Sequence, residues 1–375
     1  MDPSSVFFAY RDAPERRAAL LLPPGALERY RLFGLDELAA RAAGVQHNLE
    51  DAGAPAWARV LATSINRPLY AIGGYGGDFA TVLASLRRIN EASVVFSTVD
   101  TVGIPLMLLK RAGLVRPPLV YVSIGLPERL AQLRGKRMQG LYARALRGTQ
   151  AIVAYAKSEA EQLREWLGAA APPISFVPFG VDVDAFRPVP DLTPDTDVVT
   201  VGVDPRRDFA LLLQIAARRP ELSFRIVAST EHARALNDVP ANVAVETDIP
   251  LEQVRDRLAR ARVVALPVRD NSYSGATTVL LQAMAMAKPV VVSRTAAISE
   301  GYELEDGVNC RLVPPGNSDA FEQALVEQQT GAGATSSIGT RARQTVERGF
   351  TWERYADALW EILRGVLGAS PPPSG

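Results

Sequence analysis

Short apolar runs alternate with helix-like segments along most of this chain, and that alternation limits the folds open to it. Residues 119–122, 151–155 and 198–201 are examples of the apolar runs. Residues 79–89 place Phe, Val and Leu side chains on one helical face. Because a parallel strand pair needs a long crossover between its strands, this alternation predicts parallel sheets covered by helices.

The alternation is interrupted once, in a polar stretch rich in proline and aspartate at residues 188–197. Such breaks are typical of domain boundaries. We therefore expect an α/β fold with two Rossmann-like, doubly wound domains, residues 1–187 and 188–348. Residues 349–367 have the pattern of a final amphipathic helix, and residues 368–375 are expected to be a disordered tail.

Individual elements follow from the same patterns, although residues 54–72 stay ambiguous. The expected strands are residues 6–10, 93–96, 98–100, 119–122, 151–155, 174–178, 198–201, 224–228, 243–245, 263–266, 290–292 and 310–313. The expected helices are residues 79–89, 209–217, 251–259, 277–286 and 318–327.

The composition excludes several classes of protein. Lys and Arg total 41, as do Asp and Glu, so no overall charge attracts a nucleic acid, and a 47% hydrophobic content predicts a large buried core. One cysteine, Cys310, and two histidines leave no residues for a disulfide framework or a Cys- or His-rich metal site. With no signal-peptide pattern and no long apolar stretch, we expect a cytoplasmic protein.

The loop and helix at residues 271–286 carry the most chemical information. Ser274 is expected to cap the helix, and Gly275 and Ala276 keep side chains away from its first turn. Amides at a helix start attract anions, and in open α/β sheets that loop lies where ligands bind. An ordinary capped core helix explains the same residues equally well.

Several motifs resemble retaining family 4 glycosyltransferases of the GT-B fold. The matches are Gln282-Ala283-Met284-Ala285 with Lys288-Pro289-Val290, the segment at residues 177–188, and the start of the last helix at residues 350–355. They cover roughly residues 150–366. The resemblance implies an acceptor-binding first domain and a second domain that binds a nucleotide sugar, facing each other across a cleft. It also implies that the last helix crosses back to the first domain.

The chain departs from the family at both glutamates of this donor-binding motif. Ser274 stands at the first and Gln282 at the second, while Gly275, Ala276 and Thr277 complete the expected donor-binding loop. Gln282 can still hydrogen-bond a ribose hydroxyl, but Ser274 is shorter and uncharged. The substitutions imply an unusual donor, such as a deoxy or amino sugar, or an impaired enzyme.

A second motif bears on the donor diphosphate. In the family, Gly-Arg opens the second domain and a lysine follows; here Gly202 is followed by Val203, and Arg207 falls near the lysine with Arg206 beside it. Arginine grips phosphate with two parallel hydrogen bonds. The alternative is a solvated arginine pair, which is disfavoured at a helix start unless an anion is present.

The first domain offers weaker candidates for the acceptor side. A glycine cluster at residues 73–78 allows a close approach to the backbone, but a plain turn is equally consistent with it. Many relatives have a histidine facing the donor sugar near residues 120–129, and this chain has none there. The candidates are Gly76, Gly77, Asp78, Asp100, Ser123 and Gly125, each with simple turn chemistry as the alternative.

A basic segment suggests a further partner. From residue 129 to residue 158 there are seven basic and no acidic residues, a pattern that suits anionic lipid or a charged acceptor, although a solvated helix face is commoner. We therefore expect peripheral membrane contact through residues 129–157, at the inner face of the membrane. Asp182 and Asp184 match a metal-binding Asp-any-Asp pattern, but they lie inside a different motif.

The resemblance implies transfer of a sugar from a UDP-, dTDP- or GDP-sugar to a small-molecule, glycan, natural-product or lipid-linked acceptor, with retention and without metal or cofactor. Arg207 and Arg206 are the expected catalytic cations, since charge develops on the departing diphosphate. Two alternatives remain: a catalytically impaired partner or scaffold of the same fold, and a sugar-nucleotide epimerase.

Overall fold

The computed structural model describes residues 5–51, 53–273, 275–330 and 332–369. It divides into two compact units, one formed by Met1–Val177 with Tyr355–Gly375 and the other by Pro178–Arg354. Residues 178–187, expected in the first domain, pack with the second unit. Val181 pairs with Thr351 in a β-bridge, and the Arg343 guanidinium donates to the carbonyl of Phe186 at 3.4 Å.

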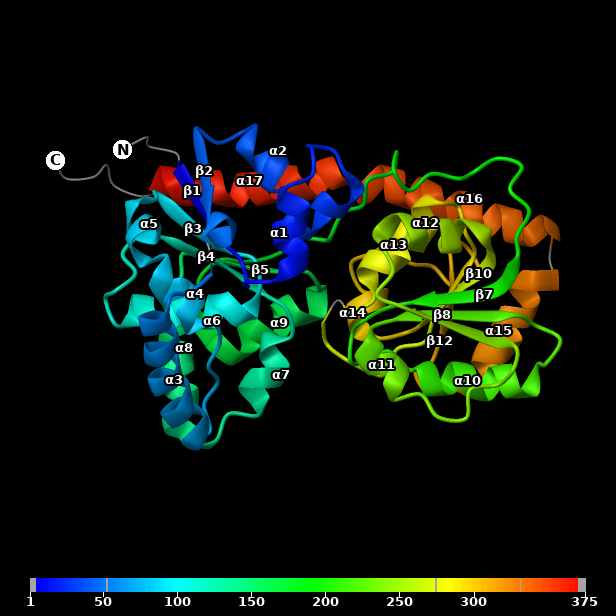
Figure 1. Ribbon diagram of the computed structural model, residues 1–375, viewed down its shortest axis with the longest axis horizontal. Coiled ribbons are helices and arrows are strands. Elements are labelled where there is room, and N and C mark those ends of the chain that lie inside the picture. The colour runs from blue at the N-terminus through cyan, green and yellow to red at the C-terminus, as the bar shows by residue number, and fades with distance from the viewer. Residues whose placement is uncertain (1–4, 52, 274, 331, 370–375) are drawn as a thin grey trace. The chain divides into compact units, whose positions relative to one another are not determined.

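The first unit contains a six-stranded sheet in the order β2-β1-β3-β4-β5-β6, and every neighbouring pair is parallel (Figure 1). Strands β3, β4 and β5 are buried along their whole length, as expected for a sheet covered on both faces. The strands are β1 Ser5–Ala9, β2 Gly44–His47, β3 Val94–Ser97, β4 Leu119–Ser123, β5 Ala151–Ala154 and β6 Ile174–Phe176.

Helices surround this sheet and include the last helix of the chain. That helix, α17, joins the unit through a hydrogen bond between the Tyr155 and Tyr355 hydroxyls at 2.9 Å and an ion pair between Arg41 and Asp357 at 2.6 Å. The helices are α1 Pro14–Leu20, η1 Leu27–Leu32, α2 Leu35–Ala39, η2 Asn48–Glu50, α3 Ala56–Ala71, α4 Phe79–Ala84, α5 Leu86–Glu91, α6 Asp100–Arg111, α7 Leu126–Ala131, α8 Gly135–Arg147, α9 Lys157–Leu167, η3 Gly168–Ala170 and α17 Trp352–Ala369.

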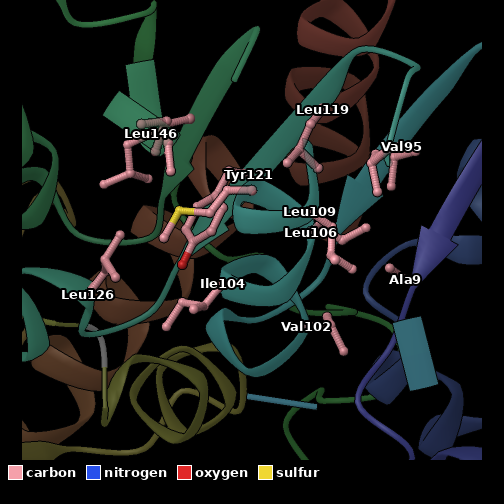
Figure 2. Packing of buried hydrophobic residues seen from close by; sticks show 14 of the residues in the cluster. Ala9, Val95, Val102, Ile104, Leu106, Leu109, Leu119, Tyr121, Leu126 and Leu146 are labelled. Carbon is pink, nitrogen blue, oxygen red and sulfur yellow. The ribbon is translucent and has the colours of Figure 1, made fainter. Parts of the chain in front are cut away.

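Part of the core of the first unit lies between the sheet and α6. Figure 2 shows Ile104, Leu106 and Leu109 of α6 gathered with side chains of β3 and β4. Gly103 allows this close packing, because a Cβ there would lie 2.6 Å from the Tyr121 ring. The packing fixes the start of α6 against the end of β4, where several candidate residues lie.

The second unit repeats the architecture, with a parallel sheet in the order β12-β11-β10-β7-β8-β9. The strands are β7 Thr196–Val201, β8 Phe224–Ala228, β9 Val243–Thr247, β10 Ala261–Leu266, β11 Val290–Ser293 and β12 Arg311–Val313. The helices are α10 Phe209–Arg218, α11 Thr230–Arg234, α12 Leu251–Arg260, α13 Thr277–Ala285, α14 Ala296–Ser299, α15 Ser318–Thr330 and α16 Ala332–Gly349. The expected pair of doubly wound α/β domains is confirmed.

Three expectations about elements are wrong. Residues 98–100 do not form a strand, because β3 ends at Ser97 and Asp100 already begins α6. The helix expected over residues 79–89 is divided at Ser85 into α4 and α5. Residues 368 and 369, expected in a disordered tail, are the last residues of α17, and residues 370–375 lie outside the described residues.

Candidate donor site and first-unit loops

The sheet order of the second unit marks a place for a ligand. From β7 the chain proceeds through β8 to β9 on one side, whereas β10, β11 and β12 lie on the other side. The loops that follow β7 and β10 therefore leave the same sheet edge in opposite directions. Ligands of open α/β sheets bind at this switch point. The two loops contain Gly202, Arg206 and Arg207 from β7 and Gly275 from β10.

Arg207 is buried at this switch point, with 3% of its surface exposed. Its backbone pairs with Val268 in an antiparallel bridge, so both loops hold it. The side chain packs over Gly202, where a Cβ would lie 2.0 Å from the Arg207 Nε. Glycine at residue 202 is therefore needed for the guanidinium to occupy this place.

The Arg207 guanidinium has an unusual electrostatic environment. Its Nε, Nη1 and Nη2 are all buried and have no hydrogen-bond partner among the described residues. Burial lowers the pKa of Arg207 to about 10, and the Asp204 carboxylate acts in the opposite direction. The group still carries its charge at neutral pH. Because an uncompensated buried cation is costly, this geometry suits an anionic ligand.

Hydrogen bonds join the two loops on either side of Arg207. The Asp208 amide donates to the Pro267 carbonyl at 2.9 Å, and the Arg269 amide donates to the Arg206 carbonyl at 2.8 Å. The Tyr273 hydroxyl donates to the Asp204 carboxylate at 2.9 Å. The loops thus form one rigid element, and Arg206 contributes to it through its backbone while its side chain is half-buried.

Helix α13 starts close to this element, at Thr277, as the sequence predicted. Ala276 occupies the N-cap position and provides no side-chain cap, while Ser274, which was expected to cap the helix, lies outside the described residues. Thr277 begins the helix and is buried. A Cβ on Gly275 would lie 2.8 Å from the Asp204 carboxylate, so the loop after β7 and the start of α13 are in contact.

This arrangement can bind a phosphorylated ligand. The first amides of a helix have no partner within the helix and carry the positive end of its dipole. They lie beside the loop that holds Arg207, because Gly275 contacts Asp204. Gln282 lies further along α13 and is 4% exposed.

In the first unit, the structure gathers the remaining candidates around the start of α6. Asp100 is buried there, where it accepts hydrogen bonds from the Tyr121 hydroxyl at 2.7 Å and the Ile124 amide at 3.1 Å. Burial raises the pKa of Asp100 to about 6, while Arg129 and the two hydrogen bonds act in the opposite direction. Asp100 thus holds the loop after β4, where Gly125 follows the last strand residue, Ser123.

A second buried carboxyl, Glu159 of α9, holds the same loop. Its Oε1 accepts hydrogen bonds from the Ser123 hydroxyl at 2.6 Å and from the amides of Gly125 at 2.7 Å and Leu126 at 3.3 Å. Burial, and then the charge of Asp100, raises the pKa of Glu159 to about 8. Gly125 adopts a positive φ of 79° that suits glycine. Ser123 is fully buried, so its hydroxyl serves this network.

The glycine-rich loop has structural reasons for its composition. A Cβ on Gly76 would lie 1.8 Å from Asn66 Oδ1, and one on Gly77 would lie 2.4 Å from the Thr101 carbonyl oxygen. Asp78 caps α4 by accepting a hydrogen bond from the Thr81 amide at 3.0 Å. The loop thus packs between α3 and α6, next to the start of α6.

Three residues of these networks do not follow from the sequence patterns. Glu159 lies in the first turn of α9, the helix that follows β5, so a carboxyl just beyond a buried strand was the available signal. Asp204 and Tyr273 gave no signal, because their contact joins loops 69 residues apart. In the described part of the chain, no cluster of three or more His, Cys, Asp or Glu side chains is arranged to hold a metal ion.

Comparison with known proteins agrees with this geometry. Residues 198–329 match the family model described as Glycosyl transferases group 1. A curated relative, D-inositol 3-phosphate glycosyltransferase of Saccharomonospora viridis, is 27% identical over 240 residues, which are 56% of this chain. The match spans 54% of the relative, about half of its length.

Solved structures resemble the chain over almost its whole length. Sucrose-phosphate synthase from Thermosynechococcus elongatus superimposes with a TM-score of 0.73 at 16% identity, covering 98% of this chain and 100% of that one. Anabaena Alr3699/HepE, in complex with UDP and glucose, gives a TM-score of 0.72 at 17% identity and covers 96% and 100%. At such identities the likeness concerns the fold.

The switch-point loops, the two parallel sheets and the family match lead to one assignment. The chain has the two-domain GT-B fold of glycosyltransferases, and its residues 198–329 match the family model of glycosyl transferases group 1.

Proposed function

We propose that the protein is a nucleotide-sugar-dependent glycosyltransferase that retains the configuration of the anomeric carbon. The observation that carries the proposal is Arg207, a buried guanidinium without a partner in the described residues, at the switch point of the second sheet. A donor diphosphate supplies the anion that this site requires. The acceptor binds on the first unit, and its hydroxyl belongs to a small molecule, a glycan, a natural product or a lipid-linked sugar.

The proposed reaction uses few protein groups. The bond between the anomeric carbon and the diphosphate oxygen breaks, and its electron pair stays on the phosphate. The acceptor oxygen bonds to the anomeric carbon from the same face, and its proton passes to a phosphate oxygen. Arg207, with Arg206 nearby and the amides at the start of α13, stabilises the charge on the leaving nucleoside diphosphate.

The donor specificity is proposed to depend on α13 and the loop before it. Gly275, Ala276 and Thr277 approach the donor through their backbone, and Gln282 is proposed to contact the ribose. The name of the relative and the UDP complex of the Anabaena protein suggest inositol phosphate as an acceptor to test and UDP-sugars as the first donors. We propose that no metal or cofactor takes part and that the reaction occurs in the cytoplasm.

A second candidate function is donor binding without turnover, as in a partner or scaffold protein. Val203 stands at the position of the family's arginine and is 68% exposed. The carboxylate of Asp204 lies next to Gly275. Both features reduce the positive charge near the proposed diphosphate, which favours an impaired site.

The test is a panel of UDP-, dTDP- and GDP-sugars incubated with the protein, with and without acceptors such as inositol phosphate. We expect release of nucleoside diphosphate, slow without acceptor and faster with a suitable one, and a product whose anomeric coupling constant matches the donor. Chelating agents should leave the rate unchanged. Nucleotide binding without any release would support the scaffold, and a lack of both would contradict the donor site.

A further inference from the structure

Helix α3 of the first unit presents large apolar side chains to solvent. Of its sixteen residues only Ala58 and Ala62 are buried. Trp57 is 54%, Val60 65% and Leu61 47% exposed, and Tyr70 and Ile72 at the helix end are also exposed. These five are a large share of the thirteen exposed large hydrophobic side chains among the described residues. Scattered exposed apolar residues are normal, but this grouping is not.

Three of the apolar residues form a group at the start of the helix. Trp57, Val60 and Leu61 are spaced by three and four residues, so they share one face of the helix. The only charged side chains of α3 are Arg59 and Arg67, both exposed. From residue 52 to residue 77 the sequence contains no acidic residue.

A basic helix lies next to the end of α3. Arg134, Lys136, Arg137 and Arg144 are exposed at the start of α8 and along it. They belong to residues 129–158, which contain no acidic residue. The basic segment noted in the sequence is therefore largely a solvent-facing helix surface.

Contacts join the segment that follows α3 to the start of α8. The Arg134 amide donates to the Gly73 carbonyl at 3.2 Å, and the Tyr75 hydroxyl donates to Gln132 Oε1 at 2.6 Å. A Cβ on Gly73 would lie 2.5 Å from the Arg134 Cβ. Figure 1 shows α3 and α8 close together along one margin of the first unit. Residues 56–72 and 134–144 are called the α3–α8 surface below.

We propose that the α3–α8 surface binds lipid bilayers that contain anionic lipid. Interfacial helices combine apolar side chains that enter the boundary between headgroups and acyl chains with basic side chains that attract anionic headgroups. The α3–α8 surface has both features and no acidic residue that would repel the membrane. A nucleic acid would use the basic side chains but leave the apolar side chains in water. No helix in the described residues is long and apolar enough to span a bilayer, so the contact is peripheral.

Vesicle flotation of the full chain tests the proposal without any sugar substrate, so its result is independent of the proposed glycosyl transfer. The vesicles are phosphatidylcholine alone or phosphatidylcholine mixed with phosphatidylglycerol. We expect binding to the mixed vesicles that falls at least tenfold on going from low to high salt. Equal binding to both kinds of vesicle, or binding to neither, would overturn the proposal.

Paired variants separate the two features of the surface. Trp57→Ser with Leu61→Ser should weaken binding at least tenfold, and Arg137→Glu with Arg144→Glu should do the same. The matched control, Val239→Ser with Arg234→Glu, changes exposed residues of the second unit and should bind normally. Since all these side chains are exposed, circular dichroism should show that each variant folds. Undiminished binding by either surface variant would contradict the proposal.

Trp57 also provides a direct signal. Its fluorescence should shift to shorter wavelength with mixed vesicles, and Trp57→Phe should lose most of that shift while still floating. The α3–α8 surface could instead bind a second copy of the chain or a nucleic acid. A dimer in sedimentation velocity that the Trp57→Ser, Leu61→Ser variant abolishes, or displacement of the vesicles by RNA with no shift of Trp57, would count against the bilayer.

Discussion

Gly202 and Arg207 lie so close together that a Cβ on residue 202 would be 2.0 Å from the Arg207 Nε. Four residues lie between them in the chain, and the turn that these residues form folds the guanidinium back over the end of β7. Their packing fixes where the positive charge lies at the switch point of the second sheet.

Gly202→Ala should therefore displace Arg207 and weaken nucleotide binding. Overpacking of this kind costs about 1–3 kcal/mol, part of which can be relieved by moving the side chain out of the site. Isothermal titration with UDP should show at least a tenfold loss of affinity. Gly365→Ala is the control, because a Cβ there meets nothing within 4 Å. Unchanged affinity in Gly202→Ala would show that Arg207 need not occupy its observed place.

Tyr273→Phe tests the link between the two switch-point loops. The variant removes the hydroxyl that donates to the Asp204 carboxylate at 2.9 Å. The loss of a hydrogen bond to a charged group amounts to about 1.5–3 kcal/mol, so UDP should bind about tenfold more weakly or worse. Tyr70→Phe, on exposed α3, should bind UDP like the parent protein. Equal affinity in both variants would mean that the loops keep their geometry without this bond.

The buried carboxyls of the first unit should make stability depend on pH. The pKa of Glu159 rises to about 8 on folding from its ordinary value of 4.5, and that of Asp100 to about 6 from 3.8. At intermediate pH the folded protein retains protons that the unfolded chain has released. The free energy of unfolding should therefore fall as pH rises, through pH 6 for Asp100 and through pH 8 for Glu159.

Glu159→Gln should flatten this dependence between pH 6 and pH 8, because the side chain no longer titrates. Urea unfolding at several pH values measures the slope. Glu161→Gln, an exposed position on the same helix, should retain the parent slope. A parent protein whose stability rises over this range would contradict the assigned direction of the pKa shift.

Two variants of Asp78 distinguish a structural role of its side chain from a role in acceptor binding. Because its carboxylate caps α4, Asp78→Ala should lower the free energy of unfolding by about 0.5–2 kcal/mol, whereas Asp78→Asn should retain most of the stability. Urea unfolding of the two variants gives this comparison. A large loss of glycosyl transfer in the stable Asp78→Asn variant would instead place the charge of Asp78 in acceptor binding.

The alternation of strands and helices could be predicted because each element shows its own pattern of apolar residues in the sequence. The strands β7, β8 and β10 and helices α10 and α12 lie within two residues of their expected ends. Helix α3 stayed ambiguous because apolar residues lie on both of its faces. Ala62, Ile65 and Leu69 face the core, whereas Trp57, Val60 and Leu61 are exposed. Helix α16 escaped because its first half consists mainly of small and polar residues.

Some features of the candidate sites could be predicted from the sequence, and others could not. Arg207 and Gly202 could be proposed from the sequence because they belong to one short local motif. The hydrogen bonds of Asp100 and Ser123 could not be predicted, because their partners, Tyr121 and Glu159, belong to other elements. Gly76 and Gly77 mark a close approach of the backbone, as the sequence suggested, and the groups that approach them are Asn66 and the Thr101 carbonyl.

The most direct test of the central claim is the affinity of UDP, dTDP and GDP for Arg207→Met compared with the parent protein, measured by isothermal titration. Arg262→Met is the matched control, since Arg262 lies near the other end of β10 and pairs with Asp197 at 3.3 Å. Removing a buried cation should leave the melting temperature of the ligand-free variant unchanged or raised. We predict that the parent and the control bind at least one of these nucleotides and that Arg207→Met binds it at least tenfold more weakly. Equal affinity in Arg207→Met would contradict the assignment of Arg207 to the donor diphosphate.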